Sequence, residues 1–227
     1  MYDCSRNAAI DYACSVESRS VTDIPEAELC RWLFSDPTVS APLCRDLELA
    51  PSTLAAFSVP TNCIVPNVEG PGDIDVLLST SPHHENALAI EVKRVKVDVD
   101  TFHTGMPGKL QDLRRGVQQA NLLGRLQFSR AMLLVVVVTD GRERHGLNFA
   151  FRGPEVPMLR KAIDEFPDRK RLAANIGLAF IELTQPVDKA IADAGSIGIR
   201  VDLRPTLAAQ SEAVTAAVRA YFDRVQS

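Results

Sequence analysis

Apolar and polar residues follow two kinds of spacing along this chain, and their order predicts its elements. Side chains of a strand alternate between two faces, whereas the apolar face of a helix recurs every three to four residues. The first predicted helix begins after Thr22 or Asp23 and has Pro25 in its first turn. The next elements are strands at Ala55–Val65, Asp73–Leu78, Ala87–Val97 and Ala131–Thr139, with a helix at Lys109–Phe128 before the last of them.

Beyond Asp140 the pattern is weaker but continues. It predicts strands at His145–Arg152, Gly177–Leu183 and Ile197–Leu203, and helices at Val156–Phe166 and Thr206–Val225. A chain of 227 residues with 46% hydrophobic content can bury a sizeable core. Because no repeat or linker divides it, we expect one α/β domain over residues 23–227, with a C-terminal extension from about residue 141 and a loosely packed arm over residues 1–22.

Two of the predicted strands carry charged residues inside apolar segments. Asp73 and Asp75 should share one face of their strand, with Ile74 and Val76 on the other. Charge beside a core costs several kcal/mol unless it is paired or coordinated. The two acids therefore need a chemical reason to be there.

Glu91 and Lys93 share a face of the following strand in the same way. If the two strands are neighbours, Asp75 and Glu91 converge at a spacing that suits a divalent cation, and oxygen ligands of this kind favour magnesium. The alternative is a surface ion pair on an edge strand, which is worth only ~0 to 1 kcal/mol and needs no function. Three acids and a lysine on one side of a sheet favour the metal site.

The run Asp73–Asp75 after Pro71 and Gly72, followed by the triplet Glu91–Lys93, resembles the motif of the PD-(D/E)XK nuclease superfamily. The resemblance covers about Pro66–Thr139 and follows the looser form of the motif, because Pro71 is followed by Gly72 and the Pro-Asp dipeptide is missing. It implies a restriction-endonuclease-like fold: a three-layer α/β core of helix, three strands, helix and strand, with a mixed central sheet and C-terminal additions. The predicted order of elements agrees with that core.

The resemblance also implies roles for the motif residues. Asp75 and Glu91 would bind Mg²⁺, or Mn²⁺ as a substitute, together with the main-chain carbonyl of Val92. Asp73 would be a further metal ligand. Lys93 would act beside the attacking water.

Two further positions follow from the same resemblance. Some branches of the family carry a glutamine on the helix after the E-x-K strand, four residues before an apolar one; Gln118 and Leu122 have that spacing, and Gln119 is the neighbouring candidate. Related nucleases also bring an acid from the first helix to the site, which here is Glu26 or Glu28. The alternatives are a solvated glutamine and acids that stabilise the first turn of a helix.

Charge is unevenly distributed along the chain. The formal net charge is −4, yet the stretch Glu91–Arg130 has eight Lys or Arg residues and four acids. A local cationic surface is enough to hold a phosphate backbone, although the solvated face of an amphipathic helix would look similar. The candidate nucleic-acid-binding residues are Arg94, Lys96, Arg114 and Arg115.

These observations predict a cytoplasmic, magnesium-dependent nuclease that acts on DNA. The longest apolar run, Ala131–Val138, is too short to span a bilayer, the N-terminus lacks a secretory signal, and the five cysteines contain no C-x-x-C pair. We expect Cys30 and Cys63 to be buried, and His83 and His84 to be exposed in a loop. The alternative function is an inactive module of the same fold that binds nucleic acid or a protein. The strands beyond the minimal core are candidates for the interface of a homodimer.

Overall fold

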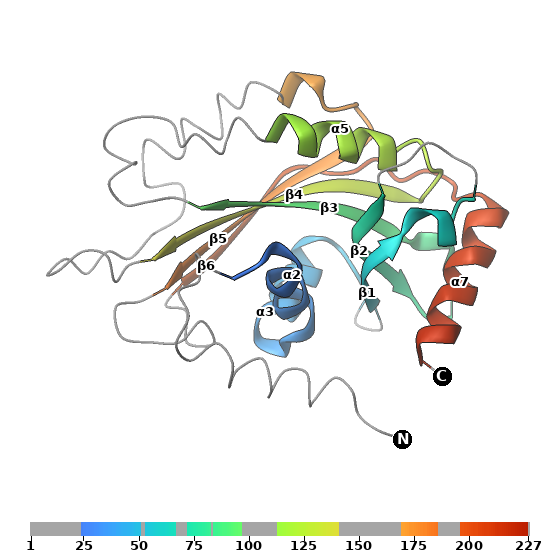
Figure 1. The fold of residues 1–227 in the computed structure, drawn as a ribbon, viewed down its shortest axis with the longest axis horizontal. Helices are drawn as coiled ribbons and strands as arrows, with labels where there is room; N and C mark the ends of the chain where they lie inside the picture. Colours follow the sequence, from blue (N-terminus) through green and yellow to red (C-terminus); the bar gives the residue numbers. More distant parts are fainter. Residues whose placement is uncertain are drawn as a thin grey trace, which may run out of the picture.

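The computed structural model describes residues 24–50, 53–66, 72–82, 84–96, 113–140, 169–185 and 196–226. These residues form an α/β fold around one six-stranded mixed sheet (Figure 1). The helices are α2 (Glu26–Ser35), α3 (Pro37–Asp46), α5 (Leu113–Leu123) and α7 (Glu212–Gln226), with short 3-10 turns η2 (Thr61–Cys63), η3 (His84–Asn86) and η7 (Arg169–Arg171). The strands are β1 (Thr53–Pro60), β2 (Asp73–Thr80), β3 (Leu88–Lys96), β4 (Arg130–Asp140), β5 (Ile176–Gln185) and β6 (Ser196–Leu203).

The strands lie in the sheet in chain order, from β1 to β6. The pairs β1–β2, β2–β3 and β5–β6 are antiparallel, whereas β3–β4 and β4–β5 are parallel. A parallel pair needs a crossover, and α5 lies on the connection between β3 and β4. The expected α/β class and mixed sheet are therefore confirmed.

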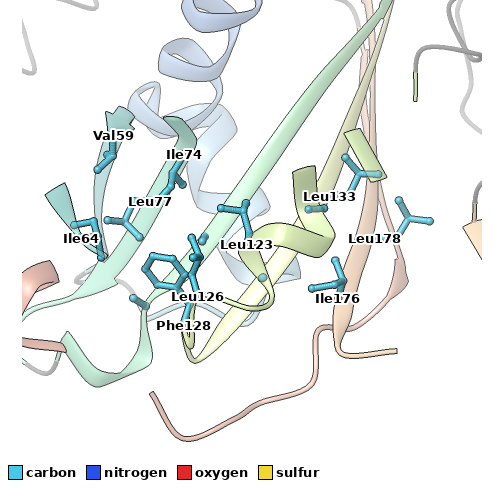
Figure 2. Close-up of a cluster of buried hydrophobic side chains, with 14 of the residues drawn as sticks. Val59, Ile64, Ile74, Leu77, Leu123, Leu126, Phe128, Leu133, Ile176 and Leu178 are labelled. Carbon is cyan, nitrogen blue, oxygen red and sulfur yellow. The ribbon is translucent and has the colours of Figure 1, made fainter. Parts of the chain in front are cut away.

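Helices cover both faces of the sheet and give the protein two cores. One core lies under α5 and α7, and Figure 2 shows Leu77 and Leu133 of the sheet in it with Leu123 and Phe128. The other lies under α2 and α3, where Leu29, Leu33 and Leu43 pack on the opposite face. Figure 1 shows α5 on one side of the strands and α2 with α3 on the other.

Most strongly apolar segments adopt the predicted elements. Residues Ala131–Val138 of β4 are buried, because a central parallel strand is covered on both faces. Pro60 ends the edge strand β1, as expected for a residue without a backbone N–H, and the chain then enters η2. Helix α3 was not predicted; Pro37 occupies its first helical position, where a missing N–H costs nothing, and Pro42 lies inside it.

Several boundaries differ from the prediction. Helix α5 ends at Leu123, and the turn that follows contains Gln127 with a φ of 61°. Helix α7 begins at Glu212, six residues later than predicted, because the hydroxyl of Ser211 accepts a hydrogen bond from the Val214 N–H and caps the helix. The predicted arm at residues 1–22, the strand at residues 145–152 and the helix at residues 156–166 lie outside the described residues.

Two predictions about individual side chains are wrong. His84 is only 4% exposed, since it stacks on Phe222 and its Nδ1 lies 2.9 Å from the Ser79 hydroxyl. Cys63 is exposed, whereas Cys30 is buried as expected. Within the described ranges, none of the helices has the length and apolar content needed to cross a membrane.

Candidate active site

The candidate site lies where β2 and β3 move apart. Their antiparallel register runs from Leu78 opposite Leu88 to Val76 opposite Ile90 and then stops. Beyond that point Oδ2 of Asp75 accepts a hydrogen bond of 2.7 Å from the Val92 N–H. The Asp75 carboxylate thus takes the place of a strand partner and is fixed next to β3.

Glu91 and Lys93 meet Asp75 at this opening. Nζ of Lys93 donates to Oε1 of Glu91 at 2.5 Å and to the carbonyl oxygen of Val92 at 2.9 Å. Oε1 of Glu26, from the N-terminus of α2, lies 3.8 Å from the same ammonium group. Three carboxylates therefore surround one lysine, and the local charge is negative.

Burial makes these charges costly. It raises the pKa of Glu91 to about 7, an effect reinforced by the charge of Asp75 and opposed by Lys93. Burial also raises the pKa of Asp75, against the hydrogen bond from Val92. Burial alone would lower the pKa of Lys93, but Glu91, Glu26 and Asp75 raise it on balance. The site would be stabilised by additional positive charge.

The donor set suits a hard cation. Glu91 is 1% exposed, and its Oε2 atom is buried with no hydrogen-bond partner. In the described ranges, no group of three or more His, Cys, Asp and Glu side chains is arranged to hold a metal ion. Magnesium needs only one or two carboxylates, because waters and substrate phosphates complete its coordination. Asp75, Glu91 and the Val92 carbonyl fit that requirement. In this structure Lys93 donates to two of their oxygens, Oε1 of Glu91 and the Val92 carbonyl oxygen.

An open pocket of about 980 Å³ contains most of the predicted site residues. Asp73 is exposed at its edge, and Gln118 and Gln119 face it from α5. The Oε1 atom of Gln119 is buried there without a hydrogen-bond partner. Among the described residues, the lining consists of Glu26, Gly72, Asp73, Asp75, Glu91, Lys93, Arg94, Val95, Leu113, Arg114, Arg115, Gln118 and Gln119.

The four candidate nucleic-acid-binding residues separate into two kinds. Arg114 and Arg115 are exposed and line the pocket. Arg94 also lines it, but its Nη1 atom donates to the Ile24 carbonyl and its N–H donates to Oε2 of Glu26 at 2.6 Å. Arg94 thus helps to hold the start of α2, and Lys96 lies outside the lining.

Sequence reasoning left one choice open and missed one residue. Of the two acids of the first helix, Glu26 lines the pocket and Glu28 does not. Gly116 of α5 went unnoticed: a Cβ atom there would lie 2.6 Å from Cγ and 3.4 Å from Cδ of Lys93. The lysine stem therefore crosses α5 where there is no side chain. A glycine inside an apolar helix stripe was the available signal.

Comparisons with other proteins add nothing to this geometry. A scan against protein-family models and searches of curated proteins and of solved structures found no match. Any proposal for function therefore depends on the residues themselves.

Proposed function

We propose that this protein is a magnesium-dependent nuclease that hydrolyses phosphodiester bonds in DNA, with a PD-(D/E)XK-type core. The observation that carries the proposal is the meeting of Asp75, Glu91 and Lys93 in one pocket, with a buried Glu91 oxygen that lacks a partner. The order α2, β1, β2, β3, α5, β4 is also compatible with that core, with α3 as an addition.

The reaction adds water to phosphorus and breaks one P–O bond, which leaves a phosphomonoester and an alcohol. Asp75, Glu91 and the Val92 carbonyl would hold Mg²⁺, and Glu26 or Asp73 could contribute a further oxygen. When bound, Mg²⁺ lowers the pKa of water and neutralises negative charge that develops during hydrolysis. Lys93 would orient the attacking water and stabilise the charge on the phosphoryl oxygens. Gln118 would contact the substrate from α5.

Cleavage assays test this proposal directly. Purified protein is incubated with single- and double-stranded DNA and RNA in Mg²⁺, Mn²⁺ or EDTA. We expect metal-dependent cleavage of DNA that is lost in Asp75→Ala, Glu91→Ala and Lys93→Ala, while Glu85→Ala, a change at an exposed acid outside the pocket, has no effect. Cleavage that survives all three site variants would refute the assignment.

An inactive binding module is the second candidate. The specific observation in its favour is that Lys93 already bonds to Glu91 and to the Val92 carbonyl, so a built-in cation partly neutralises the acids. Such a module would bind nucleic acid equally well with and without metal. Calorimetry separates the two candidates, because only the nuclease requires a Mg²⁺ or Mn²⁺ site that disappears in Glu91→Ala.

A further inference from the structure

Positive charge gathers on one surface beside the candidate active site. Helix α5 and the turn that follows it, Leu113–Phe128, contain three arginines and no acid. The 3-10 turn η7 adds three consecutive cations. We call this the α5–η7 surface; its residues are Arg114, Arg115, Arg125, Arg169, Lys170 and Arg171. Because the chain as a whole has a net charge of −4, this clustering does not follow from composition.

Specific contacts hold η7 against α5. Nδ2 of Asn121 donates to the Arg171 carbonyl at 2.8 Å, and its Oδ1 accepts from the Ala173 N–H at 2.8 Å. Gly124 allows close packing, since a Cβ atom there would lie 2.3 Å from Cδ1 of Ile176. Figure 1 shows η7, in orange, alongside α5. The two basic segments therefore form one fixed surface.

This surface begins at the pocket and leads away from it. Arg114 and Arg115, in the first turn of α5, line the pocket, and Asn121 lies near the other end of the helix. A helix of 11 residues is about 16 Å long, which matches about five base-pair steps at 3.4 Å each. A phosphate backbone lying in the pocket could thus continue along α5 to η7.

The side chains on the surface favour a duplex. Proteins that bind single strands stack bases on exposed aromatic rings. The large hydrophobic side chains exposed in the described part of the chain are Leu207 and Val225, and no aromatic ring is among them. Lys170 and Arg171 are the exposed cations of η7, whereas Arg169 is half-buried and its Nη2 atom lies 3.0 Å from Asp202.

We propose that the α5–η7 surface binds the sugar–phosphate backbone of double-stranded nucleic acid next to the bond that is cut. The position of the cut bond rests on the proposed nuclease function, whereas duplex binding by the surface does not. Contacts to phosphates release counterions, so each one contributes about 0.9 to the slope of log affinity against log salt.

The test measures binding without hydrolysis. Fluorescence anisotropy of a labelled 30-base-pair DNA duplex is recorded in EDTA at several salt concentrations. We expect Lys170→Ala/Arg171→Ala to lower the salt slope by about 2 and to weaken binding at least fivefold. The matched control is Arg45→Ala, because Arg45 is exposed on α3, on the other side of the sheet. An unchanged slope in the double variant, or an equal loss in the control, would overturn the proposal.

Two further arms sharpen the result. Asn121→Ala keeps every positive charge but removes the hydrogen bonds to Arg171 and Ala173 that hold η7 against α5. We expect weaker duplex binding and an unchanged melting temperature of the protein. A single strand of the same sequence should bind more weakly than the duplex, and tighter binding would contradict the choice of partner. Duplex binding without any cleavage would retain this surface and reject the nuclease; cleavage with normal binding by the double variant would do the reverse.

Discussion

Replacing Glu91 with glutamine should stabilise the metal-free protein while abolishing hydrolysis. Glu91 is 1% exposed, and burial raises its pKa from an ordinary value of 4.5 to about 7. Between these two values the folded protein holds a proton that the unfolded chain has released. The contribution of Glu91 to the free energy of unfolding is therefore fully present below about pH 4.5 and is lost as the pH rises through about 7. Glutamine resembles the protonated acid and removes that loss.

The expected size follows from the same shift. One pKa unit corresponds to 1.36 kcal/mol, so a rise from 4.5 to about 7 corresponds to about 3 kcal/mol at pH 8. For a protein of 227 residues, 1 kcal/mol moves the melting temperature by roughly 2 to 4 °C. Glu91→Gln should then melt about 6 to 12 °C above the wild type at pH 8. At pH 5 the difference should fall below about 1 kcal/mol.

Thermal and urea unfolding at pH 5 and pH 8, both in EDTA, measure this difference. The exposed Glu85→Gln serves as the control and should change stability by less than about 0.5 kcal/mol. Added Mg²⁺ should stabilise the wild type and leave Glu91→Gln unchanged, because a ligand that binds only the folded state raises its stability. The reasoning fails if Glu91→Gln is no more stable than the control at pH 8, or if its advantage is the same at pH 5.

Three other predictions concern the same structure. Lys93→Met should bind Mg²⁺ at least tenfold more tightly by calorimetry, because it removes a cation bonded to two of the oxygens proposed to bind the metal, yet it should not cleave. Gly116→Ala should lower kcat at least tenfold without weakening duplex binding, since its methyl group displaces the Lys93 stem. A Cβ atom at Gly72 would have no neighbour within 4 Å, so Gly72→Ala should leave stability unchanged. Burial lowers the pKa of His84, so the wild type should lose stability relative to His84→Gln as the pH falls below about 6.5, as measured by urea midpoints.

Strongly apolar and periodic segments made most of the described fold predictable. Strand β4 is buried on both faces, and its continuous apolar run predicted a buried strand. The turn chemistry was harder, because its outcome depends on tertiary contacts. Helix α3, which contains Pro37 and Pro42, was not predicted, and the start of α7 depends on the Ser211 cap.

The central residues of the site could be predicted because charge in an apolar strand needs an explanation. Asp75, Glu91 and Lys93 were placed together from that argument, and the structure brings them into one pocket. The contribution of α2 could not be predicted: whether Glu26 or Glu28 faces the site depends on how the helix packs. The rotation of α2 is fixed by its buried side chains, and sequence alone does not give their partners.

One departure from regular strand geometry links the fold to the site. Alternation predicted that Ile74 and Val76 share a face, but Ile74 lies in the core under α5 and Val76 in the core under α2. The change of face occurs at Asp75, whose position opposite Ser58 is missing from the β1–β2 register. Ser58 has a φ of 50°, a left-handed conformation that is unfavourable for a residue with a Cβ atom. Because β2 turns at this point, the Asp75 carboxylate can accept from the Val92 N–H beyond the last β2–β3 pair. The distortion therefore helps to place the Asp75 carboxylate next to Glu91, and the alternation of apolar and polar residues does not predict it.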